Sequence, residues 1–227
     1  MPVSKVRTTA TAAAALLALT LAASPAHAAS PAPSPAKKAA PARTASSVDR
    51  GVLLSAAQQP PVDETWRANP YIDPYFQPSV TGPSCWEYGR ATGARDGLGA
   101  RYDTPTWYSN YNDVWVFADS AAAASFEQQW KSLLASCVER EKPGGPMGTL
   151  YVTAVTKVET TGGVDVWRLT TGVNGGGGTQ HWQVALVRQG RAAYAMDLLD
   201  YRNGDPAPVP FASSVAAIKQ KLATYYP

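Results

Sequence analysis

Histidine and cysteine are scarce in this chain. Its 227 residues include 2 His and 2 Cys, and the spacings His-x-x-x-His and Cys-x-x-Cys do not occur. An Asp-rich calcium loop and a Gly-x-Ser-x-Gly nucleophile elbow are also missing from the sequence. Zinc, calcium and serine-hydrolase chemistry therefore find no support, and we expect no metal site and no cofactor.

The sequence also lacks an apolar run of membrane-spanning length. Its longest, an Ala- and Leu-rich stretch that ends at Ala23, falls short of the roughly 20 residues that a helix needs to cross the hydrocarbon core. A short basic stretch precedes the run, and the small residues of Ala26-His27-Ala28 follow it, as in a signal-peptidase site. We expect residues 1–28 to be a signal peptide rather than a membrane anchor. Because no Cys follows the run, we expect a secreted protein without a lipid anchor or stable membrane insertion.

Acidic residues are absent from the first 47 positions. Residues 29–47 consist mostly of Ala, Pro and Ser, which gives them little to bury and predicts a disordered tether. Five of the 20 basic residues lie before residue 48, whereas all 17 acidic residues follow it, so residues 48–227 carry a net charge of −2. This part of the chain therefore has no excess of positive charge for binding nucleic acid.

Both cysteines lie in this second part. An exported chain with one pair of cysteines normally oxidises it, so we expect a disulfide between Cys85 and Cys137. A two-cysteine metal or redox site is the alternative. About 180 residues remain after the tether, which is enough for one ordinary domain.

Hydrophobic periodicity predicts both helices and strands. We expect a short helix over 49–58 and a long helix that begins at Asp119 or Ser120, ends near Cys137 and buries one face. A third helix is expected from about Phe211 to Tyr225. Pro-rich residues 60–84 predict an ordered loop.

Strand-forming residues fill the remaining segments. We expect a hairpin with its turn at Ser109-Asn110, followed by an antiparallel meander with one buried face. The predicted strands are 101–108, 112–118, 150–158, 164–170, 180–188 and 192–199. The expected fold is a single disulfide-linked α+β domain over 48–227, with an antiparallel sheet packed against the two longer helices.

Aromatic residues are the one feature that favours binding. The chain has 7 Trp and 11 Tyr, and indole and phenol rings provide stacking surfaces for sugars and contact area for proteins. Most of them are expected in the core. The residues expected to line a ligand cleft are those near predicted loops and turns, namely Trp66, Tyr71, Tyr75, Phe76, Trp107 and Tyr108.

Catalytic alternatives have weaker support. His181 is the only histidine that would remain after removal of the signal peptide, and it lies within a predicted strand, so we expect a structural role for it. The glycine run over 174–179 lacks the Gly-Lys-Ser/Thr ending of a phosphate loop and leads into a strand, which favours a hairpin loop. Carboxylate pairs such as Asp197 with Asp200 leave a hydrolase as the least favoured hypothesis.

The order of several motifs resembles the PknH-like sensor domain family of actinobacteria. The shared features are the segment Leu53-Leu54-Ser55-Ala56-Ala57, the strand 114–117 that leads into a helix ending at Cys137, and the late strand 184–190. The resemblance implies an α+β extracellular domain with a ligand-sensing cleft, and it carries over the pair Cys85 and Cys137. It implies no catalytic residues.

Two functions of different kinds follow from these features. The first is a secreted, non-enzymatic binding domain that takes a small molecule, glycan or peptide in an aromatic-lined cleft. The second is a secreted protein-interaction module, such as an inhibitor or a cell-envelope accessory factor. In both cases the expected partner is an extracellular ligand or an envelope component, and not nucleic acid.

Overall fold

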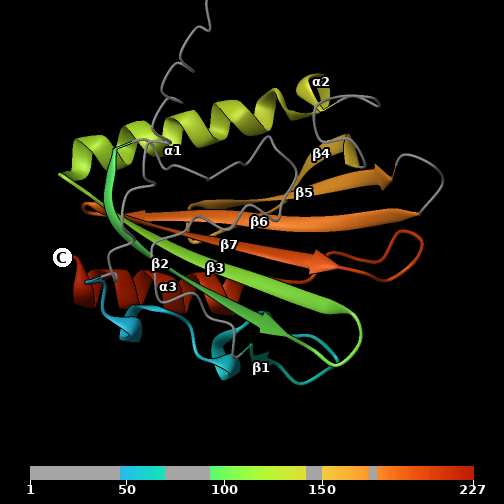
Figure 1. Cartoon of the computed structure of the whole chain (residues 1–227), viewed down its shortest axis with the longest axis horizontal. Coiled ribbons are helices and arrows are strands. Elements are labelled where there is room, and N and C mark those ends of the chain that lie inside the picture. The colour runs from blue at the N-terminus through green and yellow to red at the C-terminus, as the bar shows by residue number, and fades with distance from the viewer. Residues whose placement is uncertain (1–46, 70–92, 142–149, 174–177) are drawn as a thin grey trace, which may run out of the picture. The chain divides into compact units, whose positions relative to one another are not determined.

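The structure, a computed structural model, describes residues 47–69, 93–141, 150–173 and 178–227 (Figure 1). These residues belong to one compact unit, Ala42–Pro227. The predicted signal peptide, almost all of the predicted tether, and Tyr71, Tyr75, Phe76 and Cys85 lie outside the described residues.

A single antiparallel sheet organises the described part of the chain. Its seven strands lie in the order β1-β2-β3-β7-β6-β5-β4, so the last strand in sequence pairs with β3 at the centre (Figure 1). The strands are β1 Arg67–Ala68, β2 Ala94–Asp103, β3 Tyr108–Phe117, β4 Leu150–Thr161, β5 Val164–Val173, β6 Thr179–Gln189 and β7 Ala192–Asp200. Together with the helices, this sheet confirms the predicted α+β class.

Helix α1 spans Ser120–Ala135 and is followed by the short helix α2, Cys137–Arg140. A side-chain oxygen of Asp119 accepts a hydrogen bond from the amide of Ala122 at 2.8 Å, which caps the first turn of α1. Helix α3 spans Ala212–Tyr225. Both long helices were predicted from their apolar spacing, and the structure confirms them.

The predicted helix over 49–58 is wrong. The chain instead forms two 3₁₀ turns, η1 Arg50–Val52 and η2 Ala56–Gln58. Asp49 caps the first turn through the amide of Gly51, and Ser55 is extended, with φ −75° and ψ 166°. These local contacts satisfy the backbone without a continuous helix.

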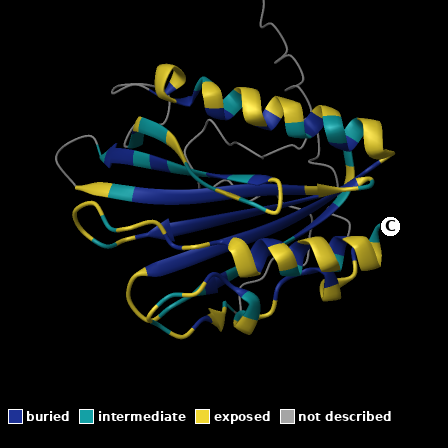
Figure 2. Ribbon diagram, turned by 180° about the vertical axis from the view of Figure 1, so that it is seen from behind, coloured by how far each residue is buried: buried dark blue, intermediate teal, exposed yellow. Residues whose placement is uncertain are grey.

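Both faces of the sheet are covered, although the sequence predicted one buried face (Figure 2). Residues His181 to Val187 of β6 are all buried. On one face, here called the α1 face, Trp182, Val184 and Leu186 pack in the same cluster as helix α1. On the opposite face, the α3 face, Ala185 and Val187 pack in the cluster of helix α3. Since successive strand residues point to opposite faces, a strand covered on both sides buries an unbroken run.

The hairpin of β2 and β3 turns earlier than predicted. Its turn lies between Asp103 and Tyr108, where the amide of Thr104 donates to the carbonyl of Tyr108 at 2.9 Å. Ser109 and Asn110, predicted as the turn, are buried residues of β3. The side-chain N–H of Asn110 donates to Oε1 of Gln59 at 2.6 Å, so this donor finds its acceptor far away in sequence, while Oδ1 is buried without a partner among the described residues.

The predicted meander is confirmed as β4 to β7. Gly162 and Gly163 join β4 to β5 with φ values of +54° and +74°, and Gly190 joins β6 to β7 with φ +51°. Left-handed backbone conformations at these positions favour glycine.

Cys137 is fully buried at the start of α2, among residues that pack against α1. Because Cys85 lies outside the described residues, the disulfide stays a prediction. The described residues contain no helix that is both long and apolar enough to cross a membrane.

Candidate functional site

The aromatic residues predicted to line a cleft have different environments. Trp66 is buried, and its indole N–H donates to the carbonyl of Pro60 at 2.7 Å. Its ring lies 6.1 Å from that of Tyr108, which is also buried in the α3-face cluster. Trp107, in contrast, has 39% of its surface exposed.

Trp107 lies beside a second exposed aromatic residue, Tyr201. Trp107 immediately precedes β3 and Tyr201 immediately follows β7, and the amide of Tyr201 donates to the carbonyl of Trp107 at 2.9 Å. Tyr201 is 38% exposed. The central strand pair therefore presents two accessible aromatic side chains at one end of the sheet.

An arginine is held beside this pair on the α1 face. The guanidinium of Arg101 donates through Nε to Oδ1 of Asp103 at 2.8 Å and through Nη2 to Oγ of Ser109 at 3.2 Å. It lies 5.2 Å from the ring centre of Tyr111, its partner across the strands. The side chain is 40% exposed. Within the described residues Nη1 has no hydrogen-bond partner, so a fixed donor remains for a ligand.

The charges of Asp103 and Arg101 follow from their contacts. Burial would raise the pKa of Asp103, but hydrogen bonds from Ser109, Arg101 and Asn69 outweigh burial and lower it. Burial would lower the pKa of Arg101, but the hydrogen bond to Asp103 and the nearby Tyr111, Asp103 and Tyr201 raise it. Both groups are therefore charged at neutral pH.

A second arginine repeats this arrangement at the same end of the sheet, but against a tyrosine of the α3-face cluster. Arg202 donates from Nη2 to Oδ2 of Asp200 at 2.7 Å and from Nε to Oδ1 at 3.0 Å. Its guanidinium carbon lies 5.0 Å from the ring centre of Tyr108. Each arginine is thus fixed by an aspartate two residues away and stacked on a tyrosine. We call Arg101, Trp107, Tyr201 and Arg202 the arginine–aromatic end.

Glu64 holds the turn that presents Trp107. Its Oε2 accepts hydrogen bonds from the amides of Thr106 at 3.2 Å and Trp107 at 3.4 Å. Hydrogen bonding, chiefly from the side chain of Thr104, lowers the pKa of Glu64. The turn therefore depends on an ionised carboxylate.

Further along β3, Asp113 lies on the α1 face between Tyr111 and Trp115. Burial raises its pKa to about 7. Its Oδ2 atom is buried, and no described residue forms a hydrogen bond with it. An unpartnered carboxyl oxygen in the interior disfavours the charged form.

The predicted structural role of His181 matches its contacts. One ring nitrogen lies 2.8 Å from the carbonyl oxygen of Gly204 and the other lies 3.5 Å from Oγ1 of Thr170. Nearby, Gln183 exchanges two hydrogen bonds with the backbone of Val209, at 2.8 and 2.6 Å. These polar side chains hold the segment that connects β7 to α3.

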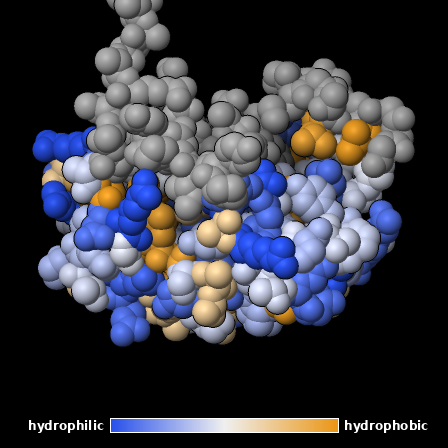
Figure 3. Space-filling view, turned by 60° about the horizontal axis from the view of Figure 1, so that its bottom comes forward, coloured by the Kyte–Doolittle hydropathy of each residue, from blue (hydrophilic) through white to orange (hydrophobic). Residues whose placement is uncertain are grey.

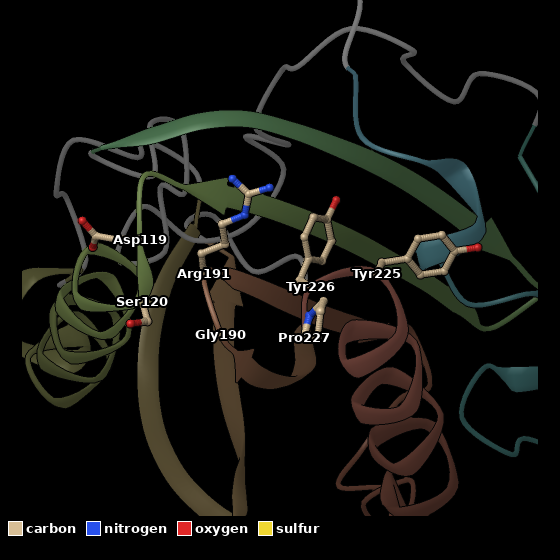
Figure 4. Close-up of a pocket in the computed structure, with 7 residues that line it drawn as sticks. All are labelled: Asp119, Ser120, Gly190, Arg191, Tyr225, Tyr226 and Pro227. Atoms are coloured by element: carbon tan, nitrogen blue, oxygen red, sulfur yellow. The ribbon is translucent and has the colours of Figure 1, made fainter.

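Three cavities formed by the described residues lie away from the arginine–aromatic end. One of about 520 Å³ lies near the N-terminus of α1 and the end of α3, where Arg191, Tyr225 and Tyr226 line it (Figure 4). A neighbour of about 320 Å³ shares Arg191 and Tyr226. A third, of about 200 Å³, lies beside α1. None of the three is lined by Trp66, Trp107 or Tyr108, so the aromatic cleft stays a prediction.

The surface around α3 is largely polar. Figure 3 shows this side of the molecule with hydrophilic side chains over most of the visible area and hydrophobic ones in small patches between them. The visible face offers no broad apolar surface of the kind that marks obligate interfaces.

Comparison with known proteins gives a distant structural likeness. No family model matches the sequence, and no curated protein is similar to it. The structure is similar to the extracellular domain of PknH from Mycobacterium tuberculosis, with a TM-score of 0.39 and 14% identity over 60% of this chain and 66% of that chain. This likeness is too distant to assign a fold family or a function.

Proposed function

We propose that this protein is a non-enzymatic binding domain that takes a neutral glycan at the arginine–aromatic end. The observation that carries the proposal is the pair of exposed rings, Trp107 and Tyr201, joined by a backbone hydrogen bond and flanked by the guanidinium of Arg101, which is held by Asp103 and Ser109 and has no partner for Nη1 among the described residues. Sugar rings stack on indole and phenol faces, while fixed polar groups bind their hydroxyls.

Charge favours a neutral ligand over an acidic one. Two arginines belong to the end, but Asp103 and Asp200 neutralise them through direct hydrogen bonds. Two more carboxylates contact members of this end, since Asp63 acts electrostatically on Arg202 and Glu64 accepts from the amide of Trp107. These carboxylates would repel an anionic polymer. Sugar hydroxyls, in contrast, can donate hydrogen bonds to carboxylates and accept them from guanidiniums.

The position of this end suits presentation to an outside partner. The described chain begins at Ser47, whose amide donates to Oδ2 of Asp96 near the start of β2 at 2.8 Å. From Asp96 to Asp103, β2 runs about 23 Å at roughly 3.3 Å per residue. The ligand end therefore lies at the other end of the strand from the point where the predicted tether joins.

We also propose that the protein acts outside the cytoplasm, because residues 1–28 have the pattern of a signal peptide. Mass spectrometry of the culture medium tests this directly. The proposal predicts a chain that begins at Ala29 and carries Cys85 bonded to Cys137. A full-length chain found only inside the cell would contradict it.

Binding of a protein partner is the second candidate. Trp, Tyr and Arg are the residue types that dominate the energetics of protein interfaces, and all three are exposed here. The interaction module and the glycan binder would therefore use the same residues, and only the ligand distinguishes them.

The experiment is a binding assay of the purified protein against short neutral oligomers of glucose and of N-acetylglucosamine. W107A and Y201A should each weaken binding roughly tenfold, which corresponds to the loss of one stacking contact. Y225A is the matched control because Tyr225 is also 38% exposed but lies at the other end of the sheet. Equal affinities of W107A, Y201A and the unmodified protein would overturn the proposal.

A further inference from the structure

A cavity beside α1 combines cationic side chains with a buried donor. It has a volume of about 200 Å³ and lies between α1, the turn that joins β4 to β5, and the end of β6. Ten residues line it: Glu127, Trp130, Lys131, Gly163, Val164, Asp165, Trp167, Leu186, Arg188 and Lys219. This volume is below the roughly 300 Å³ at which sites for drug-sized ligands begin, so an occupant must be small.

Trp167 contributes the donor. Among the residues that the structure describes, its Nε1 is buried without a hydrogen-bond partner, and Trp167 is one of the residues that line the cavity. A buried donor left unpaired costs about 1–3 kcal/mol, so native proteins normally satisfy such groups with a side chain, a water or a ligand. The natural partner of an indole N–H is an oxygen acceptor.

The carboxylates of the cavity already have partners. Glu127 accepts from Lys131 and from Nε of Arg188, each at 2.7 Å. Burial would raise the pKa of Glu127, but these two cations lower it, so it is ionised. Asp165 accepts from Oγ1 of Thr160 at 2.7 Å and lies 3.5 Å from Nζ of Lys157.

Positive charge is in excess after this pairing. The lining contains Lys131, Arg188 and Lys219 against the two carboxylates. Nζ of Lys219 donates to the carbonyl of Gly162, which keeps it beside the turn with two further N–H donors. The cavity therefore offers donors and a net positive charge.

We propose that this cavity binds a small oxyanion, such as a phosphate or carboxylate group, with Trp167 Nε1 as a donor and Lys219 as its cation. The site uses no residue of the arginine–aromatic end and is independent of glycan binding. It lies between α1, the start of β5 and the end of β6, and Lys219 of α3 completes its lining.

The probes are inorganic phosphate and acetate, with chloride at equal ionic strength as the reference. In a titration of the ¹⁵N-labelled protein, the indole resonance of Trp167 should shift saturably with phosphate or acetate and not with chloride. Comparison of the phosphate and acetate titrations distinguishes a tetrahedral from a planar oxyanion. The same shift in all three salts, or no shift, would overturn the proposal.

Variants provide a second readout through the thermal stabilisation by the better probe. W167F keeps the ring and removes the donor, and it should weaken binding roughly tenfold. W182F is the matched control, because Nε1 of Trp182 is also buried on the same face without a partner in the described part of the chain, but Trp182 does not line the cavity. K219Q, at an exposed position, should also weaken binding. Unchanged binding in both W167F and K219Q would show that the cavity holds only water.

Discussion

The carboxyl group of Asp113 fills the space where a side chain at Gly99 would begin. The two residues are direct partners across β2 and β3, and a Cβ atom on Gly99 would lie 2.6 Å from Oδ1 of Asp113. No real Cβ contact is that short, so a glycine at position 99 and the buried carboxyl at position 113 depend on each other.

Replacing Gly99 by alanine should destabilise the protein by about 1–3 kcal/mol, because the buried carboxyl must move. In a D113A background the same change should cost much less, since the obstructing atoms are gone. Chemical denaturation of the four proteins measures this coupling. If G99A lowered the free energy of unfolding equally in the unmodified protein and in D113A, the result would contradict the contact between positions 99 and 113.

Asp113 should also make stability depend on pH. Its folded pKa is raised from 3.8 to about 7, so the folded protein binds the proton more tightly than the unfolded chain. The free energy of unfolding should therefore fall by up to about 4 kcal/mol as pH rises from about 4 to about 7. Outside that window, Asp113 should make no further change to it.

D113N isolates this effect from the other carboxylates. The difference in unfolding free energy between D113N and the unmodified protein should grow in favour of D113N across that window and then level off. Parallel stability curves from pH 4 to pH 8 would show that Asp113 titrates normally.

Asp103 should respond to acid in the opposite direction. Because hydrogen bonds lower its folded pKa, its stabilising contribution is present above the ordinary aspartate pKa and is lost as pH falls through the lowered value.

D103N should release Arg101 and weaken glycan binding at neutral pH, while E139Q, at an exposed position on α2, serves as a control for charge. Glycan affinity of D103N equal to that of the control would exclude a positioning role for Asp103.

Salt distinguishes a neutral ligand from an acidic one. If the glycan is neutral, raising the ionic strength should leave its affinity nearly unchanged, because no charge pair forms on binding. A steep loss of affinity with salt would indicate that the two arginines bind an anionic group. Calorimetry at three salt concentrations is sufficient.

Local patterns predicted the two long helices better than the site. Asp119 and the apolar residues that follow it lie within a few residues of one another, so the sequence alone identifies α1. The hairpin turn was missed because Asn110 is a typical turn residue, whereas here its side chain is buried and donates to Gln59, 51 positions away in the sequence. Tyr201 was missed because it meets Trp107 only through the pairing of β3 with β7, which no local pattern encodes.

The most direct test of the proposed function is a titration of the ¹⁵N-labelled protein with the neutral oligosaccharide that binds best. The account predicts that the indole resonance of Trp107 and the Nε resonance of Arg101 shift together, with one dissociation constant, while the residues near Tyr225 stay unchanged. Saturable binding that leaves both resonances in place would contradict it.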